Sequence, residues 1–191
     1  AEVAGLDVRA QAAAVRRHIG LVGQQTAVDE VLGGRQNLVM FGRLFGLGRA
    51  AARTRADELL ERFGLTDAAG RPASTYSGGM RRRLDIAAGM IIDPTVLFLD
   101  EPTTGLDPRG RIDVWAAVTD IAERGTTVLL TTQYLDEADQ LTSTISIMKD
   151  GAIIAEGTPN ALKRQRGADR IEVTVATPSD AQKVQRALMP A

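Results

Sequence analysis

Thr95-Val96-Leu97-Phe98-Leu99-Asp100-Glu101 has the pattern of a buried β-strand that ends in two adjacent carboxylates. A second β-rich run, Thr126 to Thr132, follows an amphipathic segment from Arg111 to Arg124. Continuous runs joined by a helical crossover are typical of parallel strands that are buried on both faces of a sheet. The sequence therefore predicts an α/β fold with a mainly parallel sheet.

The two carboxylates fall where α/β folds bind their ligands, at the C-terminal edge of the sheet. Asp100 offers the carboxylate oxygen that a hard cation such as Mg²⁺ prefers. Glu101 lies one residue further out, where it could orient or deprotonate a water molecule that attacks a phosphate. For this stretch taken alone, a buried strand that ends in a solvated acidic turn is the alternative.

A second motif, Tyr76-Ser77-Gly78-Gly79-Met80, precedes a helix predicted over Arg81 to Ile92. Ser77 is a good helix cap, and the two glycines allow a close backbone approach. The free N–H groups and the dipole at a helix N-terminus also make an anion site. A plain helix cap is the alternative, but the nearby Asp-Glu strand argues against a chance arrangement.

Two further helices, Arg35 to Phe45 and Arg49 to Phe63, are predicted from apolar residues at three- and four-residue spacings, and they would form a small helical insert. In the crossover segment the same spacing predicts one buried face. Its members are Ile112, Trp115, Val118 and Ile121. We expect Trp115 to be a core residue rather than a ring that stacks on a nucleotide. The run Arg81-Arg82-Arg83 is expected on a solvated helix face rather than in a phosphate clamp.

The remaining predicted elements lie towards the two ends of the chain. Asp150-Gly151 is a signal for a type I′ hairpin. Beyond Pro159 we expect a polar, basic linker. The predicted strands are His18 to Gly23, Thr144 to Lys149, Ala152 to Glu156 and Ile171 to Ala176, and the last predicted helix is Asp180 to Leu188.

The composition is that of an ordinary globular domain, with 44% hydrophobic and 25% charged residues. A formal net charge of -1 gives no overall field that would favour nucleic acid or an acidic membrane surface. The absence of cysteine excludes disulfides and thiolate metal sites and fits a reducing compartment. No apolar run approaches the roughly 20 residues of a membrane-spanning helix.

The phosphate-binding pattern G-x-x-x-x-G-K-[ST] is absent from these 191 residues. A lysine in that pattern must follow a glycine. The three lysines, Lys149, Lys163 and Lys183, follow Met148, Leu162 and Gln182 instead.

Together the motifs resemble those of the ATP-binding subunit of an ABC transporter, over almost the whole chain. More narrowly, the sequences of these motifs are similar to those of the drug exporter ATPases of the daunorubicin-resistance type. The resemblance implies a partial P-loop NTPase (ABC ATPase) core plus an α-helical signature subdomain. By the same resemblance, Gln24 is the Q-loop glutamine, which lies near the metal and the attacking water. Asp100 is the Walker B aspartate that holds Mg²⁺, and Glu101 is the catalytic glutamate. The ABC signature is Ser77, Gly78 and Gly79, and the D-loop aspartate is Asp107.

Two departures from the family pattern affect the expected activity. Gln133 stands at the position of the switch-loop histidine, and an amide can hydrogen-bond a phosphate but cannot take up a proton. The only histidine, His18, is expected to be structural. The missing Walker A loop, which the family places before the segment resembling Ala1 to Asp7, is consistent with N-terminal truncation. We therefore expect the chain alone to bind ATP weakly or not at all.

The expected organisation has four parts. Residues 1–24 are a remnant of the nucleotide-binding core up to the Q-loop, and 25–92 are the helical subdomain with the signature. Residues 93–160 carry Walker B, the D-loop and the switch loop, and 161–191 are a linker and the start of a C-terminal extension.

The resemblance implies an ATPase that uses ATP and Mg²⁺ to energise export of a drug-like or lipid-like substrate. Its partners would be an integral-membrane permease and a second ATPase subunit in a head-to-tail dimer, on the inner face of the cell membrane. Two alternatives stay open. One is a catalytically degenerate partner that lends its signature to an intact subunit. The other is an ABC-type ATPase of DNA maintenance, which would need a long coiled coil between Gln24 and Ser77 that the sequence does not suggest.

Overall fold

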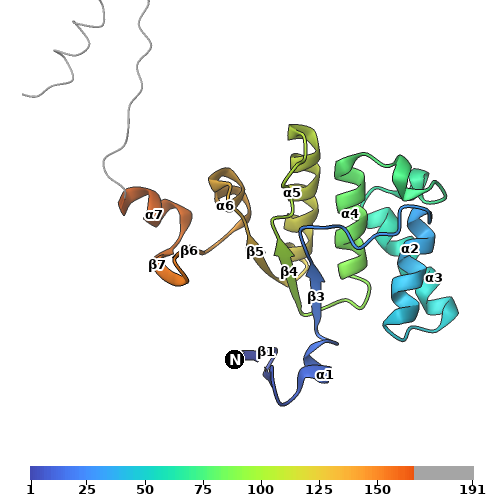
Figure 1. Ribbon diagram of the computed structural model, residues 1–191, viewed down its shortest axis with the longest axis horizontal. Coiled ribbons are helices and arrows are strands. Elements are labelled where there is room, and N and C mark those ends of the chain that lie inside the picture. The colour runs from blue at the N-terminus through green and yellow to red at the C-terminus, as the bar shows by residue number, and fades with distance from the viewer. Residues whose placement is uncertain (166–191) are drawn as a thin grey trace, which may run out of the picture. The chain divides into compact units, whose positions relative to one another are not determined.

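The computed structural model describes residues 1–165, and the chain divides into two compact units, Ala1–Leu141 and Thr142 onwards (Figure 1). Both units mix strands and helices, and each is described separately below. The first unit contains β1 (Glu2–Val3), β2 (Leu6–Asp7), α1 (Ala12–Val15), β3 (Ile19–Val22), α2 (Gly34–Leu44), α3 (Arg49–Arg62), α4 (Gly78–Gly89), β4 (Val96–Asp100), α5 (Pro108–Glu123), β5 (Thr127–Thr131) and α6 (Leu135–Leu141), with two short 3₁₀ turns at Thr66–Ala68 and Ala73–Thr75.

The central sheet of the first unit is parallel and has the strand order β3-β4-β5. Val22 pairs with Leu99, and Asp100 pairs with Thr131, so the three strands end at a common C-terminal edge. Helix α5 is the crossover between β4 and β5. The prediction of an α/β fold with parallel strands is confirmed.

The helical insert packs on the core through a continuous cluster of buried aliphatic side chains. Leu38 of α2, Leu59 and Leu60 of α3, and Leu84 and Ile86 of α4 are all fully buried. Apolar residues at these helical spacings place one stripe of each helix against the others. The two predicted helices of the insert are therefore confirmed to within one residue at each end.

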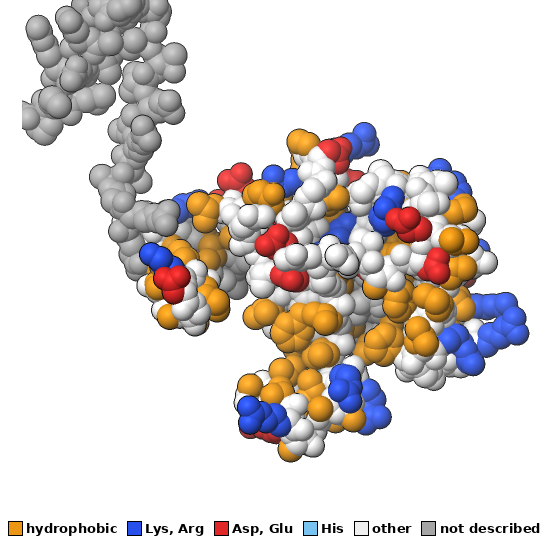
Figure 2. All heavy atoms as spheres, in the orientation of Figure 1, with side chains coloured by type: hydrophobic (Ala, Val, Ile, Leu, Met, Phe, Trp, Pro, Cys, Tyr) orange, Lys and Arg blue, Asp and Glu red, His pale blue; other side chains and the backbone are white. Residues whose placement is uncertain are grey.

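One face of the sheet is covered and the other is open. Helices α4 and α5 contribute to the same buried cluster as Val22, Leu97 and Leu99. On the opposite face Leu21 is 72% exposed and Leu129 is 54% exposed. Figure 2 shows apolar side chains gathered at the surface where β3 lies. The expectation that both faces are buried is therefore wrong for the described residues.

The predicted buried stripe of α5 is also partly wrong. Ile112 is 61% exposed and Trp115 is only half-buried. The residues that face the core follow a spacing of four, four and three along the helix, which excludes position 112. They are Gly110, Val114, Val118 and Ile121.

The second unit contains β6 (Ile145–Lys149), β7 (Ala152–Gly157) and α7 (Pro159–Gln165). The two strands pair antiparallel around Asp150 and Gly151, whose φ angles of 50° and 78° are those of a type I′ turn. The hairpin prediction is confirmed. The strand predicted over Ile171 to Ala176 and the helix over Asp180 to Leu188 lie outside the described residues.

Among residues 1–165 the structure contains no helix that is both long and apolar enough to cross a lipid bilayer.

Candidate functional site

The C-terminal edge of the sheet opens into a cavity of about 370 Å³. Three of the residues singled out from the sequence line it together, namely Gln24 after β3, Gly78 at the start of α4 and Glu101 after β4. The side chains come from segments far apart in the chain, and the parallel sheet brings them to one edge. The full lining is Gln24, Gln25, Thr26, Gly78, Arg81, Arg82, Glu101, Pro102, Thr104 and Leu106.

Asp100, the last residue of β4, is held by the neighbouring strand. The hydroxyl of Thr131 donates a hydrogen bond to Oδ1 of Asp100. The carboxylate and the hydroxyl both offer hard oxygen atoms, which are the ligands that Mg²⁺ prefers. Within residues 1–165 no three or more histidine or acidic side chains lie close enough together to hold a metal ion by themselves. A cation at this edge would therefore draw on Asp100 together with water or phosphate oxygens.

Glu101 leaves the strand in an unusual backbone conformation, with a φ of 44°. Its N–H donates to the carbonyl of Thr131 at 3.0 Å. Its Oε2 accepts a hydrogen bond of 2.9 Å from the Thr104 hydroxyl and a longer one of 3.4 Å from Nε2 of Gln133. The structure therefore brings Gln133, predicted as the switch-loop residue, to the carboxylate of Glu101.

Helix α4 begins at Gly78, three residues earlier than predicted. Ser77 is its N-cap, because the serine hydroxyl accepts a hydrogen bond from the N–H of Met80 at 3.2 Å. A Cβ on Gly79 would lie 3.0 Å from the Cα of Gly110 in α5, a tighter contact than most Cβ atoms make. The cap prediction is confirmed, and Gly79 is needed for the close approach of two helices.

Asp107 caps the next helix, α5. Its Oδ1 accepts a hydrogen bond of 3.1 Å from the N–H of Gly110. The side chain remains exposed. The same aspartate that the resemblance assigns to the D-loop therefore has a structural task within the chain.

The arginine run Arg81-Arg82-Arg83 is not a solvated helix face, which corrects the expectation from the sequence. Arg82 is only 4% exposed. Arg81 forms an ion pair of 2.8 Å with Glu30, and Arg83 donates to the carbonyl of Phe63. Charge alone suggests solvation, whereas each guanidinium here binds a partner from a distant segment.

The buried pair of Arg82 and Asp85 is a feature of the site region that the sequence pattern did not predict. Its NH1 lies 3.2 Å from Oδ2 of Asp85, one helical turn further along α4, and both side chains are buried. Burial lowers the pKa of Arg82, although the charge and hydrogen bond of Asp85 act in the opposite direction. Burial raises the pKa of Asp85, against the opposing effects of the Ala27 N–H and Arg82. The spacing of three residues between Arg82 and Asp85 was the available signal for this pair.

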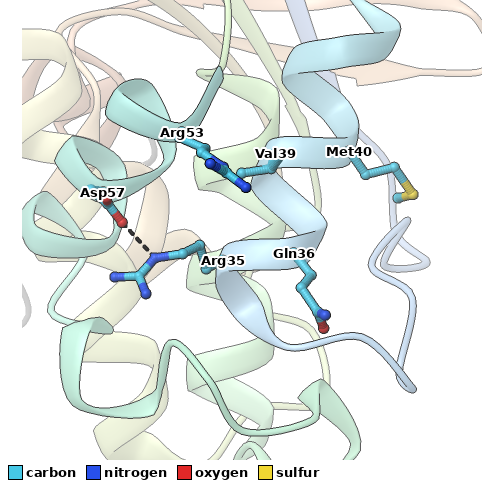
Figure 3. Close-up of a pocket in the computed structure, with 6 residues that line it drawn as sticks. All are labelled: Arg35, Gln36, Val39, Met40, Arg53 and Asp57. Carbon is cyan, nitrogen blue, oxygen red and sulfur yellow. Dashed lines mark hydrogen bonds and ion pairs between the residues drawn. The ribbon is translucent and has the colours of Figure 1, made fainter. Parts of the chain in front are cut away.

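A second hollow, of about 600 Å³, lies on the surface of the helical insert between α2 and α3 (Figure 3). Nε of Arg35 forms an ion pair of 2.6 Å with Asp57 across it. Its lining shares no residue with the cavity at the sheet edge, so the two hollows are separate features. The lining consists of Arg35, Gln36, Val39, Met40, Arg53 and Asp57.

The chain is similar in sequence to known proteins. Residues 2–104 match the family model described as ABC transporter. The chain is 64% identical to the daunorubicin resistance ATP-binding protein DrrA2 of Streptomyces coeruleorubidus, over 92% of this chain and 55% of that protein. It is 56% identical to the doxorubicin resistance ATP-binding protein DrrA of Mycobacterium tuberculosis, over 90% of this chain and 52% of that protein. The chain thus spans about half the length of these curated relatives.

The fold is also similar to that of a solved structure. This is cbiO1 from Clostridium perfringens, described as part of the ABC transporter complex cbiONQ, with a TM-score of 0.75 and 26% sequence identity. The match covers 86% of this chain and 68% of the cbiO1 chain. The resemblance inferred from the motifs is confirmed, and the chain belongs to the ABC transporter family.

Proposed function

We propose that this chain is an ATP-hydrolysing subunit that energises export of a drug-like or lipid-like compound through a separate permease. The observation that carries the proposal is the cavity at the sheet edge, because it places Gln24, Gly78 and Glu101 around one space. The similarity to proteins named for daunorubicin and doxorubicin resistance supports the exporter class.

In the proposed reaction Glu101 would be the general base and Asp100 would hold Mg²⁺. Glu101 would accept a proton from water as the water attacks the terminal phosphate of ATP. Mg²⁺, when bound, supplies positive charge to the phosphate oxygens. Gln133 and Thr104 both donate hydrogen bonds to Oε2 of Glu101, so they hold the carboxylate in one orientation.

Gln24 and the signature complete the proposed site from two sides. Gln24 would contact the metal and the attacking water from the end of β3. Ser77, Gly78 and Gly79, with Asp107, would face the nucleotide of a second ATPase subunit in a head-to-tail dimer. Ser77 and Gly78 are exposed, as such a contact requires.

We also propose that the helical insert contacts the permease, which would place the chain on the inner face of the cell membrane. Two large apolar side chains at the end of α2 support this, since Leu44 is 73% exposed and Phe45 is 51% exposed. Large contiguous apolar patches mark protein-binding surfaces, and these two neighbouring side chains would form the centre of such a patch.

The test of hydrolysis uses the chain extended at Ala1 by an added segment that carries the phosphate-binding pattern G-x-x-x-x-G-K-[ST]. Glu101→Gln should lower ATP turnover by about 10² to 10⁴, the range typical of a lost general base. Glu58→Gln, a surface change on α3, is the control and should leave turnover unchanged. Turnover that survives Glu101→Gln would rule out this glutamate as the base.

For the 191-residue chain by itself we expect weak or undetectable Mg-ATP binding, because these residues include no glycine-preceded lysine to hold the phosphates. Calorimetric titration that gives micromolar affinity would contradict this. A donor subunit that lends only its signature is the second candidate. It is distinguished by mixing the chain with an intact partner, since a donor should restore turnover that neither chain has alone.

A further inference from the structure

The buried guanidinium of Arg82 contacts three backbone carbonyls from two distant segments. Nε donates to the carbonyl of Pro102 at 2.9 Å, and NH2 donates to that of Asp100 at 3.0 Å. NH1 donates to the carbonyl of Gly23 at 2.6 Å. A guanidinium has five N–H donors in a rigid planar fork, so one side chain can fix three acceptors in a set geometry.

The positions of these acceptors follow a pattern. Asp100 and Pro102 are the two neighbours of Glu101 in the chain, and Gly23 is the residue before Gln24. Arg82 therefore holds the backbone on both sides of the proposed base and on one side of the proposed metal-contacting glutamine.

Asp85 holds the other side of that glutamine. Its Oδ1 accepts a hydrogen bond of 2.9 Å from the N–H of Ala27, while its Oδ2 pairs with Arg82. Both residues are 4% exposed, so their charges compensate each other within the protein interior. The segment that carries Gln24 is therefore attached to α4 at Gly23 and at Ala27.

The arrangement also supports the unusual conformation of Glu101. A non-glycine residue with a positive φ costs free energy and persists where the surrounding structure holds the backbone in place. Arg82 supplies these contacts at residues 100 and 102, and Thr131 binds the N–H of Glu101 itself.

From these contacts we infer that Arg82 and Asp85 are positioning residues that lock the Gln24 segment and Glu101 into one rigid unit. A displacement of residues 23–27 would be transmitted to Glu101 through the side chain of Arg82. The significance for turnover rests on the proposed function, whereas the mechanical link does not.

The link is tested without nucleotide, in the 191-residue chain, by hydrogen–deuterium exchange followed by mass spectrometry. In Arg82→Gln the amides of residues 24–27 and of residues 101, 103 and 104 should exchange at least about tenfold faster, as expected for lost hydrogen bonds to a charged group. The amides of α2 and α3 should keep the exchange of the parent chain. Asp85→Asn should speed amide exchange at residues 24–27 more than at residues 101–104, because the backbone contact of Asp85 is to Ala27.

Arg83→Gln is the matched control. Arg83 lies on the same helix and also donates to a backbone carbonyl, but that of Phe63, and its ion pair is with Asp113. It should leave exchange at residues 24–27 and 101–104 unchanged. The inference would be overturned if amide exchange rose equally along the whole chain in Arg82→Gln and Arg83→Gln. It would also be overturned if exchange at residues 24–27 and 101–104 did not change in Arg82→Gln.

The kinetic arm uses the N-terminally extended chain described above. Arg82→Gln should lower kcat by about ten- to a hundredfold with little change in KM for ATP, because displaced catalytic groups slow chemistry more than binding. Arg82→Lys keeps the charge but not the fork and should recover only part of kcat. Equal effects of both variants on KM alone would contradict the positioning role. Absence of turnover in the unmutated extended chain would instead contradict the proposed function, and the exchange experiment would still decide the mechanical link.

Discussion

Asp100 and Thr131 lie directly opposite each other at the ends of β4 and β5, and the threonine hydroxyl donates a hydrogen bond to the aspartate carboxylate. The same threonine accepts the N–H of Glu101 through its carbonyl oxygen. One residue of the neighbouring strand thus fixes both acidic residues of the candidate site. Its role follows from strand register, which is set only when the sheet forms.

Replacing Thr131 by valine should therefore weaken this edge of the sheet. Valine keeps the shape and the strand propensity but loses the hydroxyl, so the free energy of unfolding should fall by about 1 kcal/mol. Urea unfolding, followed by the fluorescence of the single tryptophan, Trp115, measures the change. Thr131→Ser is the control and should stay close to the parent chain, and equal stability of the valine variant would contradict the prediction.

Gly20 of β3 should not tolerate a side chain. A Cβ at this position would lie 2.4 Å from the carbonyl oxygen of Gly89 in α4, and backbone atoms cannot move aside cheaply. We expect Gly20→Ala to lower the free energy of unfolding by about 2 to 3 kcal/mol. Gly70→Ala is the matched control, because a Cβ there meets no atom within 4 Å. Similar unfolding midpoints for the two variants would refute this account of the β3–α4 contact.

Asp120 on α5 should contribute to stability in a manner that depends on pH. Partial burial alone would raise its pKa, but hydrogen bonds from Arg124 and Arg62 outweigh burial and hold the pKa below its ordinary value of 3.8. A carboxyl group with a lowered pKa in the folded state stabilises the protein above its unfolded-state pKa, and this contribution is lost as the pH falls through the folded-state pKa. Asp120→Asn should therefore lower stability above pH 3.8 and have a progressively smaller effect below it. Chemical unfolding at a series of pH values checks this, and an effect independent of pH would contradict it.

Glu137 on α6 is fully buried, and its Oε1 accepts a hydrogen bond of 3.0 Å from the indole N–H of Trp115. Its Oε2 has no hydrogen-bond partner. Glu137→Gln keeps an acceptor for the indole and removes a buried charge, so stability should stay equal or rise. Glu137→Ala removes the acceptor and leaves a cavity, which should cost about 2 to 4 kcal/mol.

The fluorescence of Trp115 reports on the same pair of residues. Its emission should shift to longer wavelength in Glu137→Ala, as water reaches the indole, and should stay unchanged in Glu137→Gln. A larger loss of stability in the glutamine variant than in the alanine variant would show that the carboxylate charge itself stabilises α6.

The sequence was sufficient for the features that depend on local pattern. Helical spacing located α2 and α3, the Asp150-Gly151 pair located the β6–β7 turn, and the run before Asp100 located β4. Each of these signals is contained within a few neighbouring residues, so no knowledge of distant contacts is needed.

The features that the sequence did not predict depend on long-range contacts. Local sequence predicts a solvated face for Arg82 because its binding partners, at positions 23, 100 and 102, are far from it in the chain. Helical spacing predicts that Ile112 lies on the buried face of α5, whereas in the structure Val114 faces the core. The division into four parts, at residues 24, 92 and 160, stays a prediction, as do the roles of Asp107 and Gln24 in contacts with a nucleotide.

The left-handed backbone at Glu101 restricts which residue types fit this position at low cost in free energy. Glycine, asparagine and aspartate adopt such a φ most readily, and glutamate does so at some cost in free energy. Random drift at this position should therefore favour those three smaller residues on stability alone. Persistence of glutamate among active homologues would measure selection for its carboxylate directly, separated from any selection for folding.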